Sequence, residues 1–212
     1  MDFRNLDVCG FDAAIRGMRN SYASWDKSDS REAGKFLYIG DNDMALMKKL
    51  YKAGGSERKF MRVIQIWCDI YAPLTWWKQF DTYKISTTTL STSSMHSITN
   101  KEFDITDFEY HRFADEHILE TIDYLNKSRE RYLKCEDPEY KQMYWRTIID
   151  NLPESYIQMR TVNFNYETAA HIIMDRQNHK LLEWHDFCEY MLIKLPYLKE
   201  IMNVQKDLTR GI

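Results

Sequence analysis

The chain has 212 residues, with 44% hydrophobic and 14% aromatic residues and a formal net charge of −3. This slightly acidic composition excludes a general electrostatic attraction to nucleic acid, and no apolar run approaches the length of a membrane span. The length predicts a single domain over residues 1–212. The N-terminus lacks the basic-then-apolar layout of a signal peptide, so we expect a cytoplasmic protein.

The N-terminal quarter of the chain predicts two helices joined by a loop. The first helix is expected over 11–24, and a polar loop over 28–40. One side of the first helix carries Ile15, Met18, Arg19 and Tyr22. The triplet DND at 41–43 is typical of a helix cap and the glycine pair at 54–55 of a helix end, so a second helix is predicted over 41–53.

The stretch from 62 to 71 predicts the central strand of a small sheet. Apolar residues alternate along it, and one face is formed by Ile64, Ile66, Cys68 and Ile70. Pro73 then breaks the strand and suits the first turn of a helix, because it lacks the N–H group that would be unpaired there. We expect this helix over 74–80, and its turns bring together Trp76, Trp77 and Phe80. The helices at 41–53 and 182–195 are expected to flank the strand.

A polar tract follows, in which ten of the twelve residues from 86 to 97 are Ser, Thr or His. An ordinary core contains no such tract, so it must face solvent, a partner or a ligand. It is either a solvated loop or a polar pocket whose hydroxyl and backbone N–H groups hold phosphate. Composition leaves both interpretations open.

The second half of the chain predicts mainly helices. Thr106 and Glu109 have the spacing of a capping box ahead of a long helix that runs toward Leu133 and could break near Glu116. Asp137-Pro138 starts another helix, which ends at Leu152-Pro153.

Four further elements complete the prediction. A short strand is expected over 160–164, and Asn165 caps a helix that runs through Asp175. An amphipathic helix follows over 182–195, and a peripheral helix with a frayed tail over 196–212. Helices around a small sheet make an α+β fold.

The cysteines and histidines predict no metal site. The four cysteines, at 9, 68, 135 and 188, are isolated and form no Cys-x-x-Cys pair. We therefore expect reduced, mostly buried thiols. His179 and His185 lack the i, i+4 spacing that a helical zinc site needs.

The order and spacing of these features resemble the flavin-dependent thymidylate synthases. In that family an Ala-Pro helix start and a glutamine precede the signature R-H-R-x-x-S-x-N-E-x-S-x-R-Y. A Leu-Pro, an Asn, an Arg and an aromatic-acidic pair follow it. The matching residues here are Ala72-Pro73, Gln79, residues 82–95, Leu152-Pro153, Asn165, Arg176 and Glu183-Trp184. The resemblance covers most of residues 10–195 and implies a small, mainly antiparallel sheet flanked by helices.

The signature positions themselves are largely substituted. Thr82, Tyr83 and Lys84 replace the two arginines and the histidine that would contact flavin and substrate, and only Lys84 keeps a charge. Ser94 replaces the arginine that would grip the nucleotide phosphate. Downstream, Glu167 stands where the family has an arginine, which is a reversal of charge.

The resemblance implies two ligands, deoxyuridylate as substrate and FAD as cofactor, and no metal. The residues that would hold the substrate are Gln79, Thr92, Ser94, Arg146 and Arg176. The residues that would face FAD are Lys84, Asn165 and His171. Each has a structural alternative as a loop hydroxyl, a helix cap or an interhelical salt bridge. The family's chemistry needs no protein nucleophile, so no catalytic residue is assigned.

A site with so little positive charge predicts a divergent member of this class. We expect a protein that binds a nucleotide or small phosphate ligand and whose thymidylate synthase activity is weak or lost. One alternative is an active FAD-dependent enzyme that methylates dUMP to dTMP. The other is a structural or interaction protein that keeps the fold and the assembly. The resemblance implies a homotetramer, and no nucleic-acid or membrane partner is expected.

Overall fold

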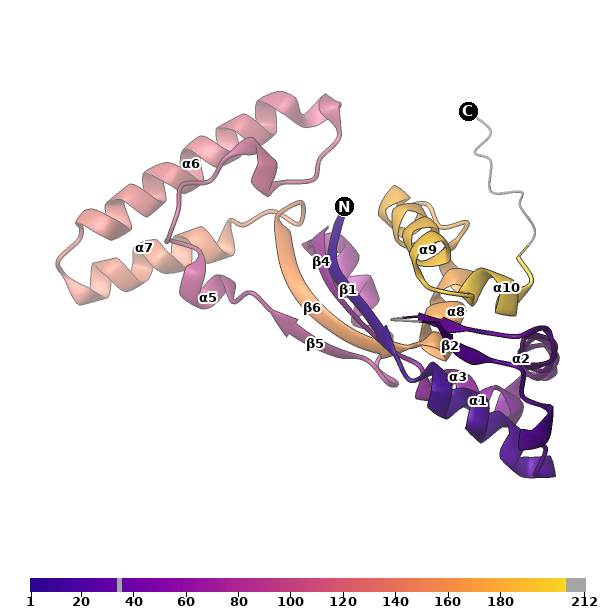
Figure 1. Ribbon diagram of the computed structural model, residues 1–212. Helices are drawn as coiled ribbons and strands as arrows, with labels where there is room; N and C mark the ends of the chain where they lie inside the picture. Colours follow the sequence, from indigo (N-terminus) through magenta and orange to yellow (C-terminus); the bar gives the residue numbers. More distant parts are fainter. Residues whose placement is uncertain (34–35, 205–212) are drawn as a thin grey trace. The chain divides into compact units, whose positions relative to one another are not determined.

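The computed structural model describes residues 1–33 and 36–204, and their contacts divide into two compact units (Figure 1). Unit 1 comprises Met1–Arg4, Asp69–Thr82 and Thr89–Thr161. Unit 2 comprises Asn5–Cys68, Tyr83–Thr88 and Val162–Ile212. The expectation of one domain over the whole chain stays a prediction.

Helices and strands alternate irregularly along the chain, as an α+β fold requires. The strands are β1 (Asp2–Cys9), β2 (Arg31–Ala33), β3 (Phe36–Tyr38), β4 (Gln65–Pro73), β5 (Thr88–Ser91) and β6 (Ile157–Asn165). The helices of unit 1 are α4 (Leu74–Phe80), α5 (Ser94–Ser97), α6 (Asp115–Lys134) and α7 (Pro138–Asp150). The helices of unit 2 are α1 (Phe11–Arg19), α2 (Asp41–Ala53), α3 (Lys59–Val63), α8 (Tyr166–Arg176), α9 (Leu182–Lys194) and α10 (Leu198–Met202). Short 3₁₀ helices occur at Asn20–Tyr22, Trp25–Lys27, Gly55–Arg58, Ile105–Asp107 and Arg112–Ala114.

The main sheet of the described residues has four strands in the order β1-β4-β6-β5. The predicted central strand is confirmed as β4, which lies inside this order. It begins at Gln65 rather than Arg62, because residues 59–63 form α3. The predicted inner face is fully buried, whereas Trp67 on the opposite face is 37% exposed. The mixed fold with a small antiparallel sheet is therefore as predicted.

Helix α4 confirms the prediction for residues 74–80 at both ends. Pro73 lies one position earlier than expected, at the N-cap, with an extended backbone. The ring centroids of Trp76 and Phe80 are 5.0 Å apart, and those of Trp76 and Trp77 are 4.8 Å apart. All three side chains are fully buried, so this short helix owes its stability to aromatic packing.

Helices α6 and α7 pack against each other in unit 1, and Figure 1 shows them side by side. Their shared core consists of Ile98, Phe103, Phe108, Ile118, Leu125 and Ile148. The N-terminus of α7 is as predicted, since the Asp137 carboxylate accepts hydrogen bonds from the N–H groups of Glu139 and Tyr140. The capping box was predicted at Thr106 and Glu109, which is wrong by two positions. The observed box joins Asp104 and Asp107 and opens a 3₁₀ turn, and α6 starts only at Asp115.

The helices of unit 2 form a continuous packing series. Helix α1 packs against α3, α3 against α8, and α8 against α9, while α10 contacts α2 and α9. Phe164 at the end of β6 contacts Phe187 of α9, with ring centroids 6.3 Å apart. The predicted helices at 41–53 and 182–195 are confirmed. The flanking of β4 by α2 stays a prediction.

Several predicted elements near the N-terminus were wrong. The expected loop over 28–40 contains β2 and β3, which pair as an antiparallel hairpin, and β1 was not predicted at all. Helix α1 ends at Arg19, five residues before the expected end, and Tyr22 is 89% exposed instead of lying on the apolar side. The polar tract is not all loop, because it forms β5 and α5; the polar pocket stays a prediction.

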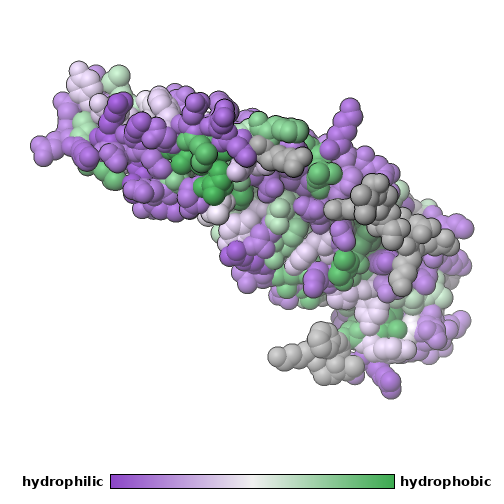
Figure 2. Space-filling view, turned by 90° about the horizontal axis from the view of Figure 1, so that it is seen from above, coloured by the Kyte–Doolittle hydropathy of each residue, from purple (hydrophilic) through white to green (hydrophobic). Residues whose placement is uncertain are grey.

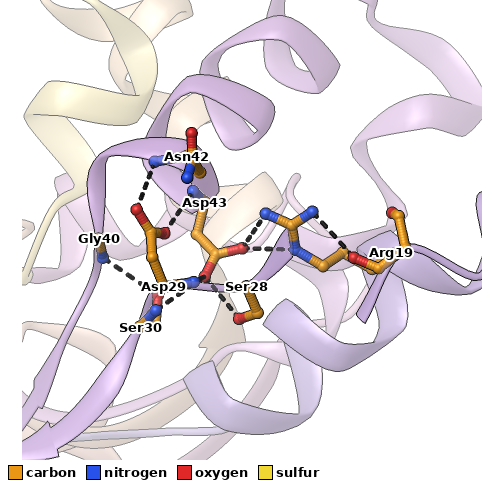
Figure 3. A network of polar contacts seen from close by, with 8 residues as sticks. Arg19, Ser28, Asp29, Ser30, Gly40, Asn42 and Asp43 are labelled. Atoms are coloured by element: carbon orange, nitrogen blue, oxygen red, sulfur yellow. Dashed lines mark hydrogen bonds and ion pairs between the residues drawn. The ribbon is translucent and has the colours of Figure 1, made fainter. Parts of the chain in front are cut away.

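A buried ion pair joins α1 to the first turn of α2 (Figure 3). The Asp43 carboxylate is fully buried and accepts hydrogen bonds from Arg19 Nε at 2.7 Å and from the Ser28 and Ser30 hydroxyls, each at 2.7 Å. The predicted cap at 41–43 was wrong. The Asp29 carboxylate caps α2 instead, by accepting the N–H groups of Asn42 and Asp43 at 2.9 and 3.1 Å.

The four cysteines lie in the described part of the chain, and no disulfide joins them there. Cys68 and Cys188 are buried, and burial raises the pKa of Cys188 to about 12, so this thiol stays protonated at neutral pH. Cys9 is exposed, so the expectation of mostly buried thiols holds for half of them.

None of the helices in residues 1–33 and 36–204 combines the length and apolar composition that a membrane crossing needs. Of the predicted C-terminal segment, residues 205–212 lie outside the described residues.

Candidate functional site

The signature segment contacts Arg176, one of the predicted substrate-binding residues, within unit 2. Arg176, the last residue of α8, donates a hydrogen bond from Nε to the Tyr83 hydroxyl at 2.8 Å. Its guanidinium carbon lies 4.9 Å from the ring centroid of Trp184 and 5.5 Å from that of Tyr83. Arg176 is therefore held in a cation–π arrangement between one residue of the signature and one of α9.

Tyr83 links this arginine to the acidic end of α8. Its hydroxyl donates to Asp175 Oδ2 at 3.4 Å, and Asp175 lies 3.3 Å from His171 Nε2. Burial raises the pKa of Tyr83, and the neighbouring Arg176 offsets only part of that effect. Tyr83 is therefore a neutral phenol at neutral pH, and it donates its single hydroxyl proton to Asp175.

The remaining predicted flavin residues differ in their surroundings. The Asn165 side chain is buried and accepts the N–H of Thr168 at 2.9 Å, so its oxygen caps α8. His171 and Lys84 are exposed. Glu167 forms an ion pair with Arg62 of α3. The reversed charge at Glu167 is thus compensated, which sequence reasoning missed because the two residues are 105 positions apart.

In unit 1 the predicted residue Thr92 belongs to a hydrogen-bonded network of side-chain and backbone groups. Thr92 donates from its N–H and its hydroxyl to the Met159 carbonyl, each at 3.0 Å, and its own carbonyl accepts Gln158 Nε2 at 2.8 Å. Gln158 Oε1 in turn accepts Arg160 Nε at 2.9 Å. The polar tract is therefore anchored to β6 by a defined network.

Arg160 is a residue that the sequence predicted only as the start of a strand. Its Nη1 donates to Asp81 Oδ1 at 2.8 Å, and its guanidinium lies 4.4 Å from the ring centroid of Trp77. Only 14% of the side chain is exposed. No local sequence signal distinguishes this arginine, because Asp81 and Trp77 lie far from it in the chain.

The other predicted substrate residues of unit 1 are Gln79 on α4, Ser94 on α5 and Arg146 on α7. Gln79 is half-buried on α4, where its carbonyl accepts the Thr82 hydroxyl at 2.7 Å. Ser94 is half-buried at the start of α5. Arg146 is exposed on α7 and pairs with Asp150 at 2.8 Å, one helical turn away. That contact is an exposed salt bridge within α7, not the interhelical one named as the structural alternative.

Metal chemistry gains no support from the described side chains. Among them, no group of three or more His, Cys, Asp or Glu residues could hold a metal ion.

The fold is that of the flavin-dependent thymidylate synthases. The chain is similar to flavin-dependent thymidylate synthase ThyX from Helicobacter pylori, solved in complex with FAD and dUMP. The identity is 14%, the TM-score is 0.71, and the match covers 95% of this chain and 97% of that one. A second structure of this ThyX with FAD and dUMP gives 13% identity and a TM-score of 0.70, with the same coverage.

A methylase with a related fold also matches. The UMP/dUMP methylase PolB from Streptomyces cacaoi, bound with 5-Br dUMP, gives 12% identity and a TM-score of 0.61 over 95% of this chain and 93% of that chain. At these identities the likeness establishes the fold alone. No protein-family model and no curated protein sequence matches the chain.

Proposed function

We propose that this chain is a divergent ThyX-like protein that binds a nucleotide or small phosphate ligand, with thymidylate synthase activity weak or lost. The observation that carries the proposal is the contact between Arg176 and Tyr83. Arg176, one of the residues that the resemblance assigns to the nucleotide, thus lies against the signature segment. Its neighbour, however, is a phenol where the family has a basic side chain.

Charge supports the loss of activity. The two ThyX structures hold FAD, whose two phosphates need several cationic partners in a partly dehydrated site. Of the residues assigned to FAD here, Lys84 carries a full positive charge, His171 is exposed beside Asp175, and the Asn165 oxygen caps a helix. Each lost hydrogen bond to a charged group costs on the order of 1.5–3 kcal/mol. These residues fit a ligand smaller or less charged than a flavin dinucleotide.

The test is a pair of ligand titrations on the purified chain. We expect no flavin absorbance to be retained after FAD is added and removed, and a weak calorimetric signal for dUMP that disappears in Arg176→Ala. Exposed Arg131 on α6 offers a matched control, since Arg131→Ala removes the same charge far from these residues in the sequence. Stoichiometric FAD together with tight dUMP binding would favour the active enzyme. Absence of all binding would favour the structural alternative.

We also infer that the protein assembles as a homotetramer in the cytoplasm. Four apolar side chains on α6 and α7 are more than half exposed: Leu119, Leu133, Tyr140 and Met143. Figure 2 shows apolar surface in green among hydrophilic residues on one face of the molecule. Self-association would cover part of this surface. A stable monomer at micromolar concentration in light scattering would count against the inference.

A further inference from the structure

A cavity in unit 2 lies among α1, the turns that follow it, α2 and α3, and we call it the α1–α3 cleft. Its volume is about 1050 Å³. The apolar part of its wall includes Ala14, Met18, Leu50, Phe60 and Val63. Gly17 of α1 also lines it and leaves it open, because a Cβ added there would meet no atom within 4 Å.

Three lysines from three different elements converge on this cleft. Lys27 follows α1, Lys49 belongs to α2, and Lys59 opens α3. All three are exposed, and none forms an ion pair with a carboxylate of residues 1–33 or 36–204. Some lysines elsewhere are paired, as Lys127 is with Asp123.

The cleft is cationic although the chain as a whole is acidic. The described lining contains one carboxylate, Glu57, and the charge of Arg19 is balanced by buried Asp43. Three lysines against one glutamate leave an excess of two positive charges. A concave site with charge of one sign attracts the opposite ion.

A second cavity in the same unit provides a contrast. It has a volume of about 630 Å³, and its described lining contains Asp12, Glu32 and Glu200 but no lysine or arginine. The positive charge of the α1–α3 cleft is therefore not a general property of the cavities in unit 2.

We propose that the α1–α3 cleft binds a small amphipathic anion, which carries a flat apolar group and a phosphate or carboxylate group. The apolar wall would cover the flat group, and the lysines would contact the anionic end as point charges. The hydroxyls of Ser21, Ser24 and Ser56 also line the cleft and can donate to anionic oxygens. None of the residues assigned to dUMP or FAD is among its described lining, so this proposal does not depend on the proposed function.

The first test uses anilinonaphthalene sulfonate, a fluorescent amphipathic anion, with the full-length chain. We expect saturable binding that weakens at least about tenfold in the triple variant K27Q/K49Q/K59Q, since contacts with charged groups carry much of the affinity. The control variant K127Q/K134Q/K141Q loses the same charge from α6 and α7 and should bind like the unmodified chain. Equal weakening of probe binding in both variants would overturn the proposal, because the weakening would then come from the net charge of the protein and not from the cleft.

The second test blocks the cleft without changing its charge. Gly17→Leu places a side chain in the open space beside α1, and retained cooperative melting shows that the variant folds. We expect it to weaken probe binding at least about tenfold as well. Unchanged binding in this variant would overturn the proposal.

Competition then identifies the chemistry of the anion. Displacement of the probe by adenosine diphosphate assigns a phosphorylated ligand, and displacement by 2-naphthoate assigns a carboxylate. Displacement by neither compound would contradict a site for amphipathic anions.

Discussion

Replacing Asp43 by Asn should destabilise the protein more than any exposed substitution in α2. The Asp43 carboxylate and the Arg19 guanidinium are 0% and 4% exposed, and Arg19 Nη2 lies 2.6 Å from Asp43 Oδ1 (Figure 3). Asn keeps the size of the side chain but leaves the buried arginine without a counter-charge. Breaking a buried ion pair costs roughly 3–5 kcal/mol, a large part of the roughly 5–15 kcal/mol that stabilises a typical domain.

Urea unfolding followed by tryptophan fluorescence measures this free energy. Asp41→Asn is the matched control, because Asp41 is exposed in the first turn of the same helix and should cost under about 1 kcal/mol through the helix dipole. If Asp43→Asn cost no more than this control, the buried pair would not stabilise the fold as we describe.

The same pair predicts the behaviour in acid. Burial raises the pKa of Asp43, but hydrogen bonds from Ser30, Ser28 and Arg19 outweigh it and lower the pKa below its ordinary value. A carboxylate whose folded pKa is depressed stabilises the fold above its unfolded pKa, and this contribution is lost as pH falls through the folded pKa. The stability difference between the unmodified chain and Asp43→Asn should therefore be constant near neutral pH and shrink below about pH 4. A difference that stays constant well below about pH 4 would contradict the assignment.

Three further substitutions test local features by thermal or urea unfolding. Gly17→Ala should stabilise α1 by about 0.5–1 kcal/mol, since the added Cβ meets nothing, and a loss of stability would contradict that geometry. Asp137→Ala removes the side-chain cap of α7 and should cost about 1 kcal/mol; a cost near zero would mean that water replaces the cap. Leu125→Ala empties a fully buried position between α6 and α7 and should cost about 2–5 kcal/mol, and a smaller cost would show that this core collapses around the gap.

Local sequence signals predicted the helices that begin at a proline or at a side chain that caps the helix. Pro73 marked the start of α4, Asp137 that of α7, and Asn165 that of α8, and the structure places each at the N-cap. These signals act between residues a few positions apart, so sequence alone is sufficient to find them. The amphipathic pattern of α9 was equally informative, since its buried residues follow the helical period.

Elements that depend on distant partners could not be predicted in this way. Strand β1 and the hairpin of β2 and β3 lack the alternation of a half-buried strand, and their pairing is non-local. Arg19 and Asp43 are 24 positions apart, and nothing in either neighbourhood predicts that they form a buried pair. The candidate site also combines predictable and unpredictable features. The spacing of motifs pointed to Arg176, but it could not reveal that the Tyr83 hydroxyl accepts a hydrogen bond from Arg176.

The direct test of the central claim is formation of dTMP from dUMP. The purified chain would be incubated with dUMP, FAD, a reductant and methylene-tetrahydrofolate, beside Helicobacter pylori ThyX as the positive reference. Our account predicts little or no dTMP from this chain, because Tyr83 and Ser94 stand where the family has basic side chains. Turnover comparable to that of ThyX, abolished in Arg176→Ala, would contradict the account and establish the chain as an active thymidylate synthase.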